Sequence, residues 1–364
     1  MQPAFLHSFV TRSHKGVYGI VRKNNQILLI RKARGPYTGL YDLPGGSPEA
    51  GETPEQTVAR EIKEETNCDL ISYTNQREKT IFFSGFTKES GEVGCMQHTG
   101  ILFDVEVAGK PTTQGDGLDS NGAVWVDINT LSSQNATPFV LMGCGKEVIN
   151  LANEEDYPVD VAVRGEPIPE GRCPMIAGVF LFNTKGNIIL QKVALTKKTD
   201  PGKWSYSAAG HVDAGETYEQ AALRELSEEM GIKASGITFV GKGHTLKNGK
   251  PRAFHHVFKV ISDDKITFDP TEVAEVKEFT IPELKQKITN HPEQFKDIFA
   301  KTVHKVGHSR LYLGADPLGV VDRLGGGKGV GLARHVKYLG AKDRAEDTRA
   351  VIRAHADPLA FFAK

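Results

Sequence analysis

The sequence predicts an α/β protein made of two copies of one domain, and three observations support this prediction. An acidic segment with a fixed pattern occurs twice, its matching positions 164 residues apart (52 and 216, 60 and 224, 65 and 229). Short apolar runs with turn residues between them precede each acidic segment, and alternating apolar runs follow it. Strands that alternate with amphipathic helices in this way are typical of an α/β fold.

Each copy begins with an expected β-hairpin. Asn and Gly occupy the turns, and both residues tolerate the positive φ that tight hairpin turns require. The flanking residues are mostly aliphatic, as expected for strands buried in a sheet. The expected hairpins comprise residues 17–22 and 26–32 around Asn24 and Asn25, and residues 175–182 and 188–192 around residues 185–187.

Capping signals then predict one helix in each copy. Thr53 and Thr217 are each followed three residues later by Gln, and this spacing is that of a capping box. The residues that follow the predicted helices are Asn67 and Gly231. Gly is the usual residue in the left-handed conformation that ends a helix, and Asn is the next most suitable.

Alternating apolar runs after each helix predict further strands, and the two copies are expected to meet near residues 150–158. The predicted organisation is a first domain over 1–152, a second over 158–306 and an extension over 307–364. The extension resembles no family, and a packing appendage, a homodimer element and a mobile tail are open alternatives. The strands expected after the helices are 81–86, 101–107 and 124–128, then 237–240 and 254–261.

Glutamates gather on one face of each predicted helix. Positions i, i+3 and i+4 share a face, so Glu61, Glu64 and Glu65 are expected to converge, beside Arg60. Their charges repel, and a hard divalent cation such as Mg²⁺ removes that repulsion and bridges carboxylates to phosphate. The alternative is a solvated acidic face, which the double occurrence of the pattern disfavours. The corresponding residues of the second copy are Arg224, Glu225, Glu228 and Glu229.

Both segments resemble the Nudix box, whose pattern is G-x5-E-x7-R-E-U-x-E-E-x-G-U, with U an aliphatic residue. The second copy, which starts at Gly210, matches at every position. The first copy starts at Gly46 and departs at Asn67 and Cys68, where Gly and an aliphatic residue are usual. The resemblance covers about residues 15–300 and implies two tandem α/β/α sandwiches with mixed sheets.

The resemblance also implies a hydrolase that uses Mg²⁺, or Mn²⁺ in its place, to cleave a nucleoside diphosphate linked to another group. That reaction needs charge neutralised on phosphate oxygens and a water activated by a carboxylate. Which acid serves as general base is left open, and Glu52 and Glu216 would be structural or outer-metal residues. The residues implied in metal binding or catalysis are Gly46, Arg60, Glu61, Glu64 and Glu65 in the first copy and Gly210, Arg224, Glu225, Glu228 and Glu229 in the second.

The approaches to the two boxes differ. Tyr41 lies five residues before the first box, as in Nudix enzymes that act on nucleoside triphosphates and oxidised nucleotides. Trp204 lies six residues before the second, which resembles the isopentenyl-diphosphate-isomerase-like branch. Those isomerases carry a catalytic Cys before the box, whereas residues 205–210 contain none and Cys173 precedes the expected first strand. A hydrolase is therefore predicted rather than an isomerase.

Aromatic and basic residues near the predicted strand ends are candidate substrate contacts. Tyr37, Tyr41 and Trp204 suit stacking on a base, with core or rim packing as the alternative. Arg31 and Lys203 suit phosphate contacts, with a solvated basic edge as the alternative. The other basic residues in these regions are Lys32, Arg34, Lys192, Lys197 and Lys198.

Composition disfavours several classes of function. Lys plus Arg and Asp plus Glu both number 45, and the formal net charge of +0 argues against bulk binding to nucleic acid or anionic membrane. No apolar run is long enough to span a bilayer, and the N-terminus does not resemble a signal peptide. The four Cys residues are scattered without CxxC spacing, which favours reduced thiols in a cytoplasmic protein.

Weaker signals receive simpler interpretations. His244, His255 and His256 lack the compact, Cys-containing ligand set typical of zinc, so they are expected to be strand and loop histidines. Residues 325–329 are Gly-rich but lack phosphate-loop spacing, which favours a turn, and an amphipathic helix is expected over 344–355.

The leading prediction is thus a tandem hydrolase acting on a small nucleotide-type substrate. A nucleotide-sensing regulator on the same scaffold is the main alternative, although complete carboxylate sets in both boxes argue against it. A third alternative is an interaction scaffold that uses the C-terminal extension. Substrate identity does not follow from the box, because specificity resides in loops outside it.

Overall fold

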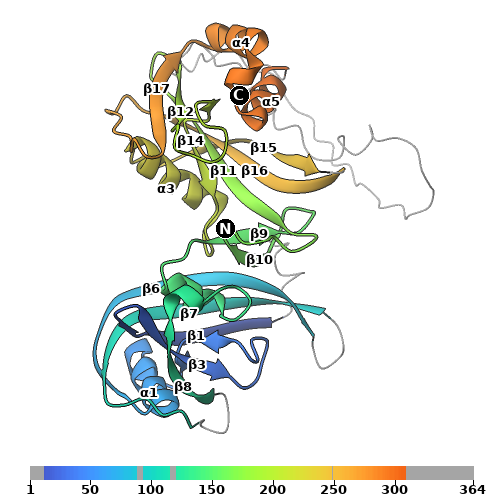
Figure 1. The fold of residues 1–364 in the computed structure, drawn as a ribbon. Helices are drawn as coiled ribbons and strands as arrows, with labels where there is room; N and C mark the ends of the chain where they lie inside the picture. The colour runs from blue at the N-terminus through green and yellow to red at the C-terminus, as the bar shows by residue number, and fades with distance from the viewer. Residues whose placement is uncertain (1–11, 88–92, 115–119, 248, 309–364) are drawn as a thin grey trace, which may run out of the picture.

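The computed structural model describes residues 12–87, 93–114, 120–247 and 249–308. Figure 1 shows two α/β halves, with β9 and β10 lying between the first half and the rest of the second. The predicted turn over 325–329, the predicted helix over 344–355 and nearly all of the extension lie outside the described residues. No helix in the described ranges is long and apolar enough to cross a membrane.

Strand β1 (Arg12–Ile20) is central to the first half. It pairs in parallel with β7 (Val93–Ala108) and antiparallel with β5 (Gly45–Gly46), and β7 also pairs with the long β6 (Asp69–Thr87). A second sheet of this half comprises β2 (Arg22–Lys23), β3 (Gln26–Lys32), β4 (Tyr41–Asp42) and β8 (Ser120–Asp127).

Strand β11 (Cys173–Phe182) plays the same part in the second half. It pairs in parallel with β16 (Lys250–Ile261) and antiparallel with β14 (Ala208–His211). The parallel central pair in each half makes both sheets mixed, so the predicted fold class is confirmed. The other strands of this half are β12 (Ile188–Val193), β13 (Trp204–Ser205), β15 (Thr238–Lys247) and β17 (Val273–Phe279).

The two acidic helices begin and end where the capping signals predict. Helix α1 (Pro54–Thr66) and helix α3 (Tyr218–Met230) both start with the expected capping box. Asn67 and Gly231 end them in the left-handed conformation, with φ of 60° and 69°. The departure from Gly in the first box therefore leaves the helix end unchanged.

In each half, helices cover both faces of the sheet structure. Successive strand residues point to opposite sides, so apolar side chains form a core on each face. Val58 and Ile62 of α1 are fully buried against one face of the first half, and Phe139 of α2 lies in the core on the other. In the second half, Leu226 of α3 occupies one core and Phe299 of α5 the other. The remaining helices are α2 (Pro138–Gly143), α4 (Ile281–Asn290), α5 (Asp297–His308), η2 (Ile128–Thr130) and η3 (Pro292–Gln294).

A hairpin spans the predicted boundary between the copies. β9 (Val148–Ala152) pairs with β10 (Pro158–Val163) and also with the start of β11, so β9 belongs to the sheet of the second half. Val148 and Val163 nevertheless pack into a core of the first half. The hairpin is therefore shared by the two halves rather than being a linker between them.

Candidate active sites in the two halves

Arg60 gathers acidic side chains in the first half. Its Nη1 donates hydrogen bonds to Glu61 Oε1 at 2.9 Å and Glu64 Oε2 at 3.0 Å. Its Nε donates to Glu52 Oε1 at 2.8 Å, and this bond is the main cause that lowers the pKa of Glu52 to about 2. Glu52 therefore fixes the arginine that orients the helix glutamates.

Glu65, the third of the predicted glutamates on α1, is turned toward the backbone instead. Glu65 is only 4% exposed, and its Oε2 accepts a hydrogen bond from the Gly45 N–H at 2.8 Å. Burial raises the pKa of Glu65, and the hydrogen bond from Gly45 and the charge of Lys32 oppose that rise. A Cβ at Gly46 would collide with the Glu61 carboxylate, so this glycine lets the helix approach the turn closely.

The second half repeats the arrangement. Arg224 Nη1 donates to Glu225 Oε1 at 2.7 Å and to Glu228 Oε2 at 3.1 Å, while its Nε donates to Glu216. A Cβ at Gly210 would likewise collide with the Glu225 carboxylate. The six expected glutamates are thus found on matching faces of α1 and α3.

Glu229, the half-buried counterpart of Glu65 in the second half, has one hydrogen-bond partner more than Glu65. Glu229 Oε2 accepts from the Ala209 N–H at 2.9 Å and from Gln191 Nε2 at 2.7 Å. Burial, reinforced by the charge of Glu225, raises the pKa of Glu229 to about 7. Sequence reasoning missed Gln191, because nothing in a strand pattern indicates which helix residue a strand side chain will meet.

The glutamates do not form a ready-made metal site. Within the described ranges, no three His, Cys, Asp or Glu side chains converge closely enough to hold a metal ion. The predicted convergence is therefore incomplete, because Arg60 holds Glu61 and Glu64 while Glu65 faces the backbone. The residues still fit a hard divalent cation, because it binds carboxylate oxygens and favours the charged form of a buried carboxylate.

Two of the predicted substrate contacts in the first half engage one another. Arg31 Nη2 donates to the Tyr41 hydroxyl at 2.9 Å, and the guanidinium lies 4.6 Å from the centre of the tyrosine ring. Arg31 and Lys32 are neighbours on β3, and Tyr41 and Asp42 are neighbours on β4. Because successive strand residues point to opposite sides, Arg31 and Tyr41 lie on one side of the sheet and Lys32 and Asp42 on the other.

The predicted contacts of the second half lie apart from its glutamates. Trp204 is 7% exposed and packs edge-on against Phe279, with ring centres 5.2 Å apart. Lys192 covers the indole from 5.5 Å. Lys203 forms an ion pair with Asp200 at 3.0 Å. Trp204 is therefore a core residue, which is the alternative that the sequence left open.

A cavity of about 430 Å³ lies in the first half, and Lys32 in its wall connects it with the α1 glutamates. Arg12, Lys32 and Arg34 line it together with Asp42, and Lys32 acts electrostatically on both Glu61 and Glu65. Sequence reasoning named Lys32 and Arg34 but missed Arg12 and Asp42, because these two come from other segments that only the fold brings to Lys32 and Arg34.

The floor of this cavity contains a buried histidine that sequence reasoning did not single out. Tyr18 Oη lies 2.8 Å from His98 Nε2, and Tyr37 Oη lies 3.4 Å from His98 Nδ1. Burial lowers the pKa of His98 to about 3, so the imidazole is neutral at physiological pH. Both of its ring nitrogens have partners, and Tyr37 is a buried residue of this floor.

The three histidines noted in the sequence lie on β15 and β16. His256 Nε2 lies 2.8 Å from Asp156 Oδ2 and stacks on the Tyr218 ring, with ring centres 3.6 Å apart. Tyr218 and Lys242 also donate to Asp156, at 2.7 and 3.1 Å. Burial alone would raise the pKa of Asp156, but His256, Tyr218 and Lys242 outweigh it and lower the pKa.

The stretch before the second box contains buried hydroxyls rather than a thiol. Ser207 Oγ donates to the Ile189 carbonyl and accepts from the Leu181 N–H at 2.7 Å, so it joins strands of the core. Cys173 is the first residue of β11, where it is buried and its thiol donates to the Pro251 carbonyl at 3.1 Å. Both groups have structural roles.

Comparisons with known proteins match both halves. The NUDIX domain matches residues 12–140 and 174–300. The chain is similar to isopentenyl-diphosphate Delta-isomerase 2 of Photorhabdus laumondii, at 30% identity over 168 residues that make up 45% of this chain and 95% of that protein. It is also similar to an ADP-ribose pyrophosphatase of Methanocaldococcus jannaschii, at 38% identity over 115 residues, 32% of this chain and 62% of that protein.

Solved structures give the same type of match. The crystal structure of DR0079 from Deinococcus radiodurans shares 26% identity with this chain, with a TM-score of 0.39. The match covers 44% of this chain and 99% of that one. A MutT Nudix hydrolase from Burkholderia pseudomallei matches over 37% of this chain and 97% of its own, at 22% identity and a TM-score of 0.26.

Proposed function

The chain belongs to the NUDIX domain family in both halves, and from this premise we propose that it is a divalent-metal-dependent hydrolase of nucleoside-diphosphate-linked substrates. The bond cleaved is a phosphoanhydride. One observation carries the proposal. In each half, glutamates of one helix face a glycine-containing turn, and one of them, Glu65 or Glu229, accepts a hydrogen bond from the backbone of that turn. A pair of such sites is expected of an enzyme more than of a binding protein.

The proposed cation is Mg²⁺, for which Mn²⁺ would substitute. When bound, it would neutralise charge on the phosphate oxygens and so favour attack by water. The residues proposed to hold it are Glu61, Glu64 and Glu65 with the Gly46 backbone in the first half, and Glu225, Glu228 and Glu229 with the Gly210 backbone in the second.

Glu65 and Glu229, which accept a hydrogen bond from the turn, are the glutamates that a bound cation would change most. Burial raises the pKa of Glu65 and brings that of Glu229 to about 7, and the cation would favour the charged form of both. Arg60 and Arg224 would hold the remaining glutamates in place through the hydrogen bonds described above.

For the first half we propose nucleoside triphosphates or modified nucleotides as substrates. Its cavity presents Arg12, Lys32 and Arg34 next to the carboxylates, and cationic side chains of this kind bind phosphate oxygens. Lys32 lies near enough to Glu61 and Glu65 to act on their charge, so a phosphate held by Lys32 would lie beside the proposed metal site.

A hydrolysis panel with matched variants tests the proposal. The substrates are dNTPs, oxidised dGTP, ADP-ribose, dinucleoside polyphosphates, NDP-sugars, NADH and CoA, each with and without Mg²⁺. The variants Glu64→Gln/Glu65→Gln and Glu228→Gln/Glu229→Gln should each lose about 10²-fold or more in the activity of one half. Glu55→Gln and Glu219→Gln, at matching positions in the first turns of the same helices, are the controls and should keep it.

Two results would contradict the proposal. One is turnover that survives both double variants combined, because the glutamates would then have no part in it. The other is a wild-type chain that turns over nothing yet binds a nucleotide tightly, which would replace the hydrolase by a nucleotide-sensing regulator.

A further inference from the structure

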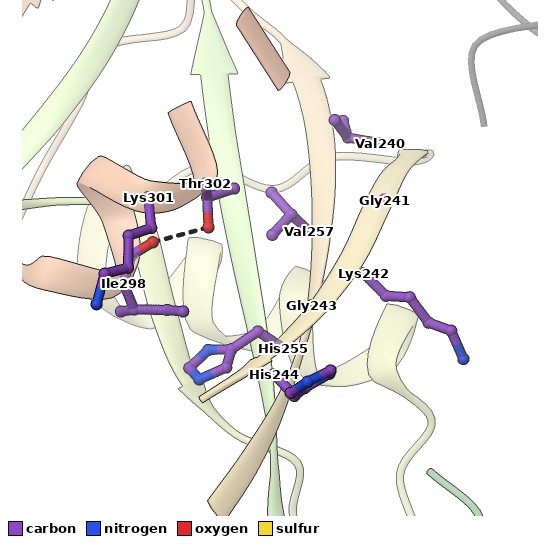
Figure 2. Close-up of a pocket in the computed structure, with 10 residues that line it drawn as sticks. All are labelled: Val240, Gly241, Lys242, Gly243, His244, His255, Val257, Ile298, Lys301 and Thr302. Carbon is purple, nitrogen blue, oxygen red and sulfur yellow. Dashed lines mark hydrogen bonds between the residues drawn. The ribbon is translucent and has the colours of Figure 1, made fainter. Parts of the chain in front are cut away.

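A second cavity, of about 370 Å³, lies in the second half between β15, β16 and α5. It is on the face of the sheet opposite α3, because Val257 and the α5 residue Ile298 belong to the core on that side. Val240 completes its apolar wall, and Figure 2 shows these residues around the open space. The volume is within the range of small-molecule pockets.

The cavity exists because two strand positions carry no side chain. Gly243 pairs with His255 and Gly241 with Val257, and paired residues on neighbouring strands share a face of the sheet. A Cβ added at either glycine would meet no atom within 4 Å. A side chain could therefore begin at either position without a clash at its Cβ, and glycine leaves this space open.

One polar group faces the cavity without a partner. His255 is 7% exposed, and its Nε2 is buried with no hydrogen-bond partner in the described structure. In Figure 2 its imidazole extends from β16 toward Ile298. By contrast, both ring nitrogens of His98 in the first half are within reach of tyrosine hydroxyls. A buried polar group without a partner is costly, which points to a ligand that completes it.

The surroundings exclude an anionic occupant. Burial, with the charges of His211, His244 and His256, lowers the pKa of His255 to about 4, so its ring is neutral. The nearby ammonium groups are already paired, Lys242 with Asp156 at 3.1 Å and Lys301 with Asp297 at 2.7 Å. The cavity thus offers apolar walls, the Thr302 hydroxyl, which is already bonded to Tyr206 and Ile298, and one neutral group without a partner.

The cavity is also placed within reach of the glutamate site. His255 and His211 both lie opposite Ile176, on the two strands that flank β11. Their backbones are therefore about 10 Å apart. His211 directly follows Gly210, the glycine beside Glu225. A molecule of nucleotide size that is seated in the cavity can extend to this turn.

We propose that the cavity binds the heteroaromatic base of the substrate's nucleoside, with His255 Nε2 bonded to the edge of the ring. A purely aliphatic group would leave Nε2 unpaired, and a phosphate would find no free cation among the described lining residues. A base has two apolar faces and a polar edge, which matches the walls and the histidine. The assignment rests on the proposed function, because it places the nucleoside of that substrate.

Free nucleosides test the assignment, because they lack the phosphates that the glutamate site would require. The full chain, labelled with ¹⁵N-histidine, is titrated with adenosine, guanosine, cytidine and uridine, and His255→Gln identifies the His255 signals. At least one nucleoside should shift these signals. Gly243→Val and Gly241→Val fill the cavity and should weaken binding at least 10-fold, whereas Gly236→Val, in open space outside it, should not.

The outcomes separate this assignment from the proposed function. Glu228→Gln/Glu229→Gln should bind the nucleoside like the wild type and lose the hydrolysis that the second half contributes. The assignment is overturned if no nucleoside shifts the His255 signals, or if the shift survives in both cavity-filling variants. Nucleoside binding without any nucleotide hydrolysis would contradict the proposed function and leave the cavity assignment standing.

Discussion

The loop before α1 and the loop before α3 share one sequence pattern but have different surroundings. In the first half, residues 48–51 are exposed. In the second half, Val212 and Ala214 of the matching loop are fully or almost fully buried, and Ala214 belongs to a core of the first half. The same local structure is thus free at the surface in one copy and enclosed between the halves in the other.

Strand β9 accounts for most of this difference. Val148 O accepts from Ala214 N at 2.8 Å, and Asn150 N donates to Val212 O at 2.8 Å. The Asn150 side chain, 3% exposed, donates to the carbonyls of Asp213 and Glu216 at 3.1 Å each. The repeated sequence therefore determines the helix and its caps, while residues outside the repeat hold the loop of the second site.

The largest expected difference between the loops comes from matched glycines. Gly51 and Gly215 both have φ of 87°, but an added Cβ meets nothing at Gly51 and lies 3.1 Å from the Thr80 carbonyl at Gly215. Gly51→Ala should lower the free energy of unfolding by about 1–2 kcal/mol for the left-handed backbone. Gly215→Ala should cost about 1–3 kcal/mol more, because the backbone of Thr80 must move.

Equilibrium urea unfolding measures both variants. Equal losses for the two would show that the contact between the second loop and Thr80 does not restrict the site. A greater loss for Gly51→Ala would reverse the comparison altogether.

Removing the Asn150 side chain should have the next largest effect. Asn150→Ala deletes two buried hydrogen bonds to the loop and should lower the free energy of unfolding by about 1–3 kcal/mol. It should also raise the KM of the second site alone, measured in the Glu64→Gln/Glu65→Gln background. Asn25→Ala, which removes an exposed bond to Asp127, is the control and should change neither. An unchanged KM would limit Asn150 to a structural role.

A smaller, pH-dependent effect on stability is expected at Asp156, in the turn between β9 and β10. The folded chain lowers the pKa of Asp156, so the carboxylate stabilises the fold above its unfolded pKa of about 3.9. This stabilisation is lost as the pH falls through the lower, folded pKa. Thermal unfolding of Asp156→Asn should thus show a deficit at pH 6 that shrinks below pH 4. A deficit that does not change with pH would contradict this role.

The smallest effect is expected at the end of α1. Asn67 already adopts the left-handed conformation, with φ of 60°, so Asn67→Gly should change the free energy of unfolding by less than about 0.5 kcal/mol. Asn67→Val should cost about 1–2 kcal/mol at the same site, because a β-branched residue suits this conformation poorly. Similar values for both variants in thermal unfolding would show that the cap contributes little.

Local signals were sufficient to predict α1 and α3 and their glutamates. A capping box, the i, i+3, i+4 spacing and the residue after each helix all act within a few positions of the chain. Gly231 shows the limit of this reasoning, because a Cβ there would collide with Thr267, a contact that arises only in the folded protein. At Asn67, where the sequence has no Gly, the left-handed cap forms all the same.

Properties that depend on distant partners were not predictable in this way. Trp204 is an aromatic residue before a box in the sequence, but only the fold shows that Phe279 and Lys192 cover it. Asp156 lies in a polar segment of the sequence, and only the fold shows that its carboxylate contacts Tyr218 and His256. The cavity at His255 likewise depends on glycines of a neighbouring strand, and no local pattern shows which residue a glycine will face.

The shared hairpin has a consequence for how this protein can be divided and inherited. A protease that cut between β9 and β10 would separate two strands of one sheet, and the nicked fragments should stay associated through that sheet. Recombination that transferred only one half to another gene would remove either the strand that supports the second loop or the core that this strand enters. We therefore expect neither half to keep both its core and its loop without the other.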